Sequence, residues 1–337
     1  MLRKIIEVPA TYQRNQYIGG ADIPGIIGVS PWSTPLSVWE RKMQQQEARV
    51  STGKKKLFQR GKVWEQVVGE MLVAQLEAEE FEVRVIANNK RYVDEAVPFF
   101  ASEIDYELEI KGLPDTINAE LKTVHPNAAR EWGDPDDDET AAPVQYLAQV
   151  QWGLGVTGRE VCILAPLFGA DEVKVYVVKR DQAVIDGMRA QALEFWHDHV
   201  LTKIAPEPRN LSDINRLFKL DNERELIADE GIIRSLMRYR AIESEIEARE
   251  TERDLIEFDL KCAMRDATAI VQPGLKKALA TWKTRNSSRL DQEAFKQAYP
   301  KLYRQFLRES SSRAFAVSKF KQTEITHHGG TRQIRNE

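Results

Sequence analysis

Two oppositely charged side chains, Glu120 and Lys122, stand two residues apart in the stretch TINAELKTVHP. The stretch favours a β-strand, and residues i and i+2 of a strand project from the same face. The two side chains would then lie side by side, while Leu121 between them points into a core on the other face. Such a pair is either an ordinary solvated ion pair or half of a metal-dependent nuclease site.

Further carboxylates could complete such a site. Hydrolysis of a phosphodiester needs a divalent cation that neutralises charge on the phosphate, and a deprotonated water in line with the leaving oxygen. Mg²⁺ prefers hard oxygen ligands, usually a few carboxylates and water. Asp105 lies on the preceding strand-like run and could pair across from Glu120, and Glu65 could enter from a helix packed on the sheet. These acids and Lys122 could therefore converge on one point.

Helices and strands alternate along the part of the chain that must position these groups. Pro35 suits the first position of a helix that begins after Thr34. A lysine-rich loop, STGKKKLFQRG, is expected before a long helix at about 61–80, whose apolar arc leaves Glu65 at its edge. Strand-like runs follow at 81–87, 91–94, 98–110 and 116–124.

The second half of this region repeats the alternation. The segment PVQYLAQVQWGLGV is expected to be a helix, with Tyr146 and Gln149 on a face beside its buried side. EVCILAPLF is typical of a buried strand and EVKVYVVKRD of a half-exposed one. Asp181 then caps a helix that runs to about residue 202. This order of elements predicts an α/β domain over residues 1–205.

The rest of the chain is expected to form a mostly helical extension. Residues 206–221 suit a linker, residues 222–320 a helical and small α+β region, and residues 321–337 a disordered tail. Several basic residues of this extension could contact nucleic acid. Its aromatic residues are interpreted instead as a small core, formed by Trp282, Phe295, Tyr299 and Tyr303.

Charge is segregated along the chain, although the formal net charge is only −4. Eleven Lys and Arg accompany four Asp and Glu in residues 1–62, six accompany twenty in 63–140, and nine accompany two in 273–308. Basic flanks beside an acidic centre suit a protein that attracts a polyanion and holds cations where chemistry occurs. Charged surfaces are common, however, so this pattern alone decides little.

Cysteine usage and hydropathy set the expected location. Cys162 and Cys262 lie far apart, which excludes a disulfide framework and a four-cysteine iron–sulfur site. A reducing cytoplasm is therefore expected. No run approaches the roughly 20 apolar residues that span a bilayer, and the first residues lack the apolar core of a secretory signal. We expect no membrane association.

The chain resembles the phage-type alkaline exonucleases, the YqaJ-like viral recombinases of the PD-(D/E)XK nuclease superfamily. The resemblance covers about residues 12–200 and rests on four segments in the same order, YIGGADIPGIIGVSPWSTPLSVWERK, RGKVWEQVVGEML, ELKTVHPNAAREWG and YLAQVQWGLGVTG. A lone Glu-x-Lys is common by chance, whereas four ordered segments are specific. The resemblance implies a mixed central sheet flanked by helices, the restriction-endonuclease-like core.

The resemblance also implies roles for the candidate residues. Asp105 and Glu120 would bind Mg²⁺, or Mn²⁺ in its place, with the main-chain carbonyl of Leu121 as a third ligand. Lys122 would position or activate the attacking water. Glu65 would bind a second metal, or a water bound to the metal.

Other residues of the resembling segments would contact DNA. Gln149 would reach the metal site or the scissile phosphate. Arg14 lies seven residues before Ala21, where the family places a basic residue that grips a terminal 5′-phosphate. Ser30 or Ser33, in the turn GVSPWS, could add hydroxyl contacts to this phosphate.

The sequence departs from the family pattern near Asp105. Tyr106 stands where the family often has glycine, and the spacing from Asp105 to Glu120 is long. That spacing includes Asp115, which directly follows a proline. Because Asp115 precedes Glu120 by only five residues, we expect it near the turn that joins the two strands and favour Asp105 as the ligand.

The resemblance implies a Mg²⁺-dependent 5′-to-3′ exonuclease. It would act on double-stranded DNA ends and leave 3′ single-stranded overhangs for phage-type homologous recombination. A single-strand annealing protein and a ring-shaped homo-oligomer are the implied partners, in the cytoplasm of a bacterial host. Two alternatives stay open: another PD-(D/E)XK nuclease, either an endonuclease or one of different polarity, and a non-catalytic DNA-end binding or assembly protein.

Overall fold

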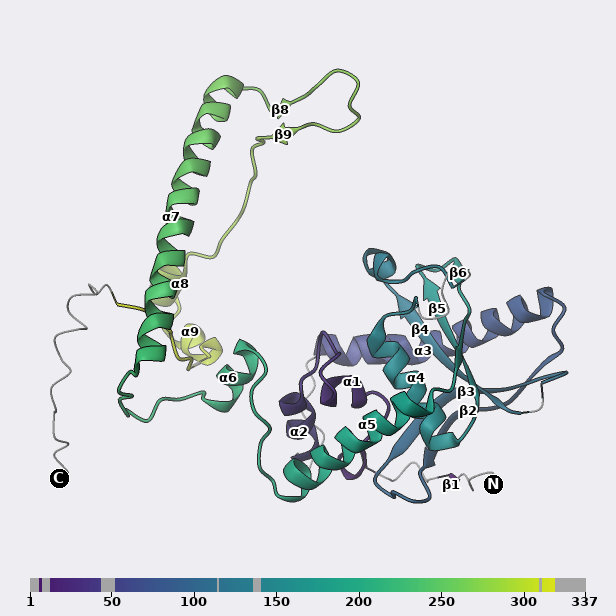
Figure 1. Cartoon of the computed structure of the whole chain (residues 1–337). Helices are drawn as coiled ribbons and strands as arrows, with labels where there is room; N and C mark the ends of the chain where they lie inside the picture. The colour runs from purple at the N-terminus through teal and green to yellow at the C-terminus, as the bar shows by residue number, and fades with distance from the viewer. Residues whose placement is uncertain are drawn as a thin grey trace, which may run out of the picture. The chain divides into compact units, whose positions relative to one another are not determined.

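The computed structural model describes residues 6–7, 13–43, 52–113, 115–135, 141–308 and 311–318. The chain divides into two compact units, Met1–Leu217 and Phe218–Glu337 (Figure 1). The disordered tail predicted at 321–337 lies outside the described residues. Within the described ranges, no helix is long and apolar enough to cross a membrane.

A mixed sheet forms the centre of the first unit. Over the described residues it has seven strands: β1 (Ile6–Glu7), β2 (Val83–Val93), β3 (Ala101–Ile110), β4 (Ile117–Val124), β5 (Val161–Phe168), β6 (Glu172–Val173) and β7 (Tyr176–Lys179). Neighbours from β1 to β4 are antiparallel, β4 and β5 are parallel, and both β6 and β7 pair antiparallel with β5. The predicted α/β class with a mixed sheet is confirmed.

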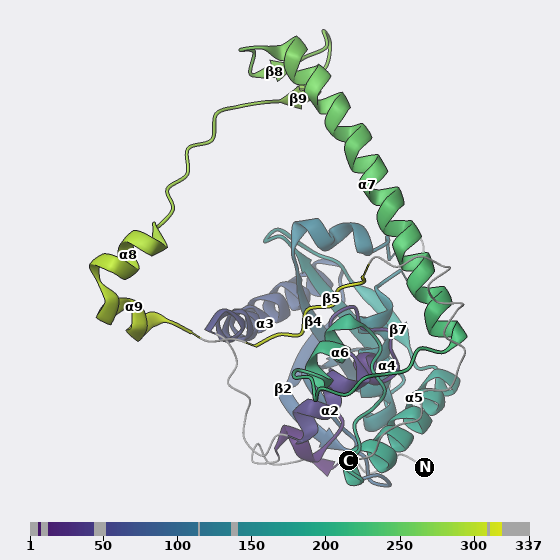
Figure 2. The ribbon, with the colours of Figure 1, turned by 90° about the vertical axis from the view of Figure 1, so that its left-hand side faces the viewer.

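Helices cover both faces of this sheet, as Figure 2 shows. On one face lies α3 (Thr52–Ala78), which packs against β3, β4 and β5 through an apolar side that includes Leu72. On the other face lie α4 (Val144–Thr157) and α5 (Gln182–Phe195). Helix α4 is part of the crossover that joins the parallel strands β4 and β5, as a parallel pair requires.

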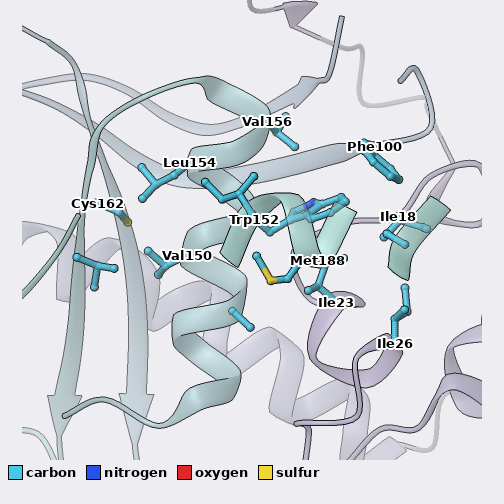
Figure 3. Close-up of a cluster of buried hydrophobic side chains, with 14 of the residues drawn as sticks. Ile18, Ile23, Ile26, Phe100, Val150, Trp152, Leu154, Val156, Cys162 and Met188 are labelled. Carbon is cyan, nitrogen blue, oxygen red and sulfur yellow. The ribbon is translucent and has the colours of Figure 1, made fainter. Parts of the chain in front are cut away.

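The core on the α4 side gathers residues from distant parts of the chain (Figure 3). Trp152 is fully buried, donates its indole N–H to the Ala101 carbonyl at 2.9 Å, and meets the Phe100 ring edge-on. Short helix α1 (Ile23–Ile26) contributes its isoleucines, and α5 contributes Met188. This packing fixes Ile18 and α1 against the core on this face of the sheet.

Two predicted helix starts are confirmed. Helix α2 (Pro35–Met43) begins at the expected proline. The Asp181 carboxylate accepts hydrogen bonds from the backbone N–H groups of Ala183 and Val184, as an N-cap does. Helix α5 continues into a π-helical turn, Trp196–Leu201, which brings its end close to the predicted residue 202.

Two other boundaries differ from the sequence-based expectation. Helix α3 begins at Thr52, so the lysine-rich segment predicted as a loop is helical. Lysine is a good helix former and this segment contains no proline, so the helix propagates through it. Strand β2 is continuous where two short strands were expected, because Asn88 and Lys90 in the expected gap pair with Tyr106 and Ile104 of β3.

Helix α6 (Leu211–Leu217) lies inside the segment 206–221 that the sequence predicts as a linker, and it belongs to the first unit. Asp213 on this helix is fully buried. Its carboxylate accepts the Thr34 hydroxyl at 2.9 Å and pairs with Arg216. The hydrogen bond to Thr34 holds α6 beside the start of α2. The segment 206–221 is therefore not a linker along its whole length.

The second unit is largely helical, as predicted, and consists of α7 (Glu230–Met264), the hairpin β8 (Ala269–Ile270) and β9 (Ala280–Thr281), α8 (Gln292–Ala298) and α9 (Pro300–Phe306). Proline at position 300 begins α9 and separates it from α8. The predicted aromatic core is wrong. Trp282 is 45% and Tyr299 59% exposed, and Lys261 places its ammonium 5.4 Å from the Trp282 ring.

Candidate metal centre

Strands β3 and β4 separate where the candidate acids lie. Their antiparallel pairing ends at Tyr106 opposite Ala119. One step further, Asp105 would face Glu120 in the same register. There the Asp105 carboxylate, in place of a backbone carbonyl, accepts the N–H of Leu121 at 2.8 Å. The break in the ladder thus brings the acid of β3 to the charged segment of β4.

The Glu120 carboxylate is buried and held by two donors. The Lys122 ammonium and the side-chain amide of Gln149, on α4, both donate to its Oε1. Leu121 lies in the core on the α3 side, which confirms the alternation expected for this strand. Three predicted site residues, Asp105, Glu120 and Lys122, therefore meet; we call them the acidic cluster.

Charge in the acidic cluster is unbalanced. Burial, and next repulsion from Glu120, raises the pKa of Asp105 to about 7. Burial alone would lower the pKa of Lys122, but the attraction of Glu120 and Asp105 outweighs it and raises that pKa. Lys122 is therefore an ammonium at neutral pH. Two carboxylates share this one cation, so ionised Asp105 leaves the cluster net negative.

The donor set fits a cation that needs few protein ligands. Mg²⁺ is usually bound by one or two carboxylates and keeps several waters, and Asp105 and Glu120 supply two carboxylates from adjacent strands. In the part of the chain that the structure describes, no group of three or more acidic, histidine or cysteine side chains could hold a metal.

Glu65 lies on α3, at a cavity of about 630 Å³ that Tyr106 also lines. Burial, followed by repulsion from Asp105, raises the pKa of Glu65. Gly69, one turn further along α3, lets the helix approach β3, since a Cβ there would collide with the Tyr106 ring. Glu65 is thus an electrostatic neighbour of Asp105, and its role through a second metal or a water stays a prediction.

Helix α4 adds an aromatic residue that the sequence analysis did not assign to the site. The Lys122 ammonium lies 5.7 Å from the Tyr146 ring centroid, and Tyr146 stacks on Trp132 with centroids 5.1 Å apart. The available sequence signal is the spacing of three between Tyr146 and Gln149, which places both on one helix face. Gly20 lies against this face, where a Cβ would stand 3.1 Å from the Gln149 side chain.

A second charged cluster surrounds Asp22, just before α1. The buried Lys42 of α2 donates to the Asp22 carboxylate at 2.6 Å and to the backbone carbonyls of Tyr17 and Arg14. Arg41 bonds the other carboxylate oxygen at 3.1 Å. Burial raises the pKa of Asp22, but Lys42 and Arg41 outweigh it and lower that pKa. We call these four charged residues, Arg14, Asp22, Arg41 and Lys42, the Asp22 cluster.

Arg14, the predicted 5′-phosphate ligand, lies in a 3₁₀ turn, Arg14–Gln16. Burial would lower its pKa, but the carboxylates of Asp22 and Glu103 raise it, so both acids lie within electrostatic reach of the guanidinium. The Asp22 cluster therefore fixes the backbone of Arg14 through Lys42 and attracts its side chain through Asp22.

The two predicted serines lie in the turn that follows α1. Ser33 places its hydroxyl 3.5 Å from an Arg41 nitrogen, which connects it to the Asp22 cluster. Ser30 uses its oxygen to accept the backbone N–H groups of Trp32 and Ser33. Ser33 is thus close to a guanidinium, whereas Ser30 stabilises the turn.

Asp115 lies away from the acidic cluster. It lines a different cavity, near the turn between β3 and β4, together with Phe81 and Lys111. It precedes β4 and lies five residues before Glu120, which is about 16 Å along a fully extended chain. The structure therefore places Asp105, the acid favoured from the sequence, beside Glu120.

The chain is similar to one protein family and to a bacterial protein. Residues 11–160 match the model of the YqaJ-like viral recombinase domain. The chain is 26% identical over 321 residues to the uncharacterized protein YqaJ of Bacillus subtilis (strain 168), a match that covers 90% of this chain and 92% of that protein.

Similar solved structures include an alkaline exonuclease from Laribacter hongkongensis, with a TM-score of 0.41 and 14% identity over 57% of this chain and 91% of that one. A phage-related exonuclease from Haemophilus somnus 129PT gives a TM-score of 0.40 and 12% identity, and the match covers 56% of this chain and 96% of that one.

Proposed function

We propose that this protein, whose residues 11–160 match the model of the YqaJ-like viral recombinase domain, is a Mg²⁺-dependent deoxyribonuclease. It acts as a 5′-to-3′ exonuclease on double-stranded DNA ends and leaves 3′ single-stranded overhangs; Mn²⁺ substitutes for Mg²⁺. The observation that carries the proposal is the meeting of Asp105, Glu120 and Lys122 where β3 and β4 separate.

The residues of the site have distinct tasks in this reaction. Asp105, Glu120 and the Leu121 carbonyl would hold Mg²⁺, which would supply neutralisation of phosphate charge and a more acidic water. Lys122 stays protonated, so it orients the attacking water and stabilises negative charge rather than removing a proton. Gln149 fixes the Glu120 carboxylate through its side-chain amide. Glu65 would bind a second metal or a water bound to the metal.

The direction of the reaction depends on Arg14 in this proposal. Its guanidinium binds a terminal 5′-phosphate, with the Ser33 or Ser30 hydroxyl as an additional donor. A single-strand annealing partner, a ring-shaped homo-oligomer and a place in phage-type recombination in the cytoplasm belong to the same proposal. They are supported by the family description of residues 11–160.

One assay separates this function from its alternatives. Linear duplexes with a 5′-phosphate or a 5′-hydroxyl, and a closed circular duplex, are each incubated with Mg²⁺ or EDTA. We expect mononucleotide release with Mg²⁺ and none with EDTA, and faster release from the 5′-phosphorylated than from the 5′-hydroxyl linear duplex. Cleavage of the circle would indicate an endonuclease, and release from 3′ ends the opposite polarity. Binding of ends without any release would indicate a non-catalytic DNA-end binding protein.

A further inference from the structure

Trp32 projects from the surface of the first unit on a well-fixed turn. It is 70% exposed, whereas tryptophan is highly buried on average. Its backbone N–H donates to the Ser30 hydroxyl at 3.2 Å, and the N–H of Ser30 itself donates to the Pro24 carbonyl at 2.9 Å. The indole is thus held in the open by an ordered backbone.

Aromatic contacts connect Trp32 to the acidic cluster. The ring centroids of Trp32 and Tyr146 lie 6.3 Å apart, within the range of aromatic pairs. The Lys122 ammonium lies 5.7 Å from the same Tyr146 centroid, so the Trp32 ring is within 12 Å of that ammonium. An exposed indole therefore stands beside the proposed catalytic centre.

The inner end of this aromatic group is rigid. Trp132, on which Tyr146 stacks, is buried and meets Phe168 edge-on at 5.7 Å and Tyr176 at 5.5 Å. The Tyr176 hydroxyl also bonds the carbonyl of Gly133, the next residue, at 2.7 Å. We call Trp32, Tyr146 and Trp132 the aromatic platform. Its buried end is fixed and its outer end offers a flat apolar surface.

We propose that the aromatic platform is a nucleobase-binding site, in which Trp32 stacks on a base of the DNA strand that enters the acidic cluster. This inference rests on the proposed nuclease function. Twelve ångströms correspond to at most about four base steps of about 3.4 Å, so the base belongs to one of the first nucleotides beside the scissile phosphate. Stacking tolerates any base, as an enzyme that degrades DNA without regard to sequence requires.

A nucleic acid fits this surface better than a protein partner does. The platform leads from Trp32 to the ammonium of Lys122, which attracts phosphate, and Arg41 lies in the helix that follows the Trp32 turn. Aromatic rings beside cationic side chains are the combination by which proteins bind single-stranded DNA.

The test measures binding rather than cleavage. The full chain is titrated, in Ca²⁺, against a 5′-phosphorylated duplex labelled at its far end, with fluorescence anisotropy as the readout. A second duplex has abasic residues at the first four positions of the 5′-ended strand. Trp32→Ala should weaken binding to the intact duplex about tenfold, since stacking on one base corresponds to roughly 5- to 150-fold. On the abasic duplex the variant and wild type should differ by less than about twofold.

Two further variants complete the design. Trp32→Tyr keeps an aromatic ring and should retain most of the affinity for the intact duplex. Phe81→Ala removes an aromatic side chain that is 47% exposed near the turn after α3, and should leave both affinities unchanged. Circular dichroism checks that each variant is folded.

The outcomes separate this inference from the nuclease proposal. Wild-type affinity of Trp32→Ala for the intact duplex, or an equal loss on both duplexes, overturns the platform. Wild-type affinity of Trp32→Ala would indicate instead that Trp32 contacts a protein partner. Cleavage is then measured in Mg²⁺ on the same proteins. A wild type that binds with the expected base dependence and never cleaves overturns the nuclease proposal alone.

Discussion

The acidic cluster and the Asp22 cluster each contain a buried carboxylate, Glu120 and Asp22, yet their charges are balanced differently. Asp22 meets the cations of Lys42 and Arg41, and its pKa is lowered. In the acidic cluster two carboxylates share the ammonium of Lys122, and the pKa of Asp105 is raised. Burial acts on both carboxylates in the same direction, so the supply of cations makes the difference.

This difference indicates what each cluster is for. A carboxylate whose charge is matched by neighbouring cations stabilises the local structure. Lys42, which pairs with Asp22, also donates to the backbone carbonyl of Arg14 and so fixes this turn. A carboxylate pair with too few cations is costly in the free protein and is relieved by a bound metal. The acidic cluster is therefore the place for an added cation, and the Asp22 cluster the place for an added anion beside Arg14.

The largest expected effect follows from disrupting the acidic cluster. Glu120→Gln and Lys122→Ala should each reduce mononucleotide release by about 10³-fold or more, because each removes a charge that acts in the transition state. Release from a 5′-phosphorylated duplex in Mg²⁺ is the measurement, with circular dichroism to show that the fold is intact. Lys111→Ala removes a surface lysine paired with Glu82 and is the control. Wild-type rates in either variant would refute the assignment.

Disrupting the Asp22 cluster should act on stability. Lys42→Met leaves the Asp22 carboxylate buried with one of its cations removed, which should cost about 3–5 kcal/mol of the free energy of unfolding in urea. The double variant with Asp22→Asn should recover part of this loss. Lys90→Met removes a surface lysine paired with Glu7 and should change stability little. A double variant no more stable than Lys42→Met would show that the two charges are not coupled.

Arg14→Ala tests the anion site without touching the acidic cluster. We expect release from 5′-phosphorylated ends to slow about 10- to 100-fold, the value of a charge-assisted hydrogen bond, and release from 5′-hydroxyl ends to slow much less. Steady-state rates on the two duplexes measure the preference. Arg84→Ala, on the exposed part of β2, is the control. Equal slowing on both substrates would remove Arg14 from the phosphate site.

The smallest expected effect concerns the stability of the metal-free protein. The pKa of Asp105 is raised to about 7 in the folded state, above its unfolded value of about 3.9, so its ionisation opposes folding increasingly as pH rises through this range. Asp105→Asn keeps an acceptor for the Leu121 N–H. It should therefore raise the free energy of unfolding by about 1–2 kcal/mol at pH 8 in EDTA, and by less as pH falls toward 5.

Thermal unfolding across this pH range measures the effect, and Asp115→Asn is the matched control at the far end of the same strand pair. In excess Mg²⁺ the wild type should be more stable than Asp105→Asn, because the metal stabilises the wild type and lacks one of its ligands in the variant. A gain that is independent of pH would mean that the Asp105 charge does not oppose folding.

Features carried by local sequence were predictable. The start of α2 at Pro35 and the cap at Asp181 follow from neighbouring residues, and the structure confirms them. Predictions of where an element begins or ends were less accurate. Helix α3 extends back to Thr52 because helix propagation through good formers costs little. The supposed linker contains α6 because Asp213 finds distant partners.

The sequence by itself determined that Glu120 and Lys122 share one face of a strand, since the two-residue period of a strand is a local property. Only the tertiary structure decided what surrounds them. The end of the β3–β4 pairing brings Asp105 to Leu121, and the packing of α4 brings Gln149 to Glu120. These contacts join residues that are distant in the sequence, and no local pattern encodes where two strands part or which face a crossover helix covers.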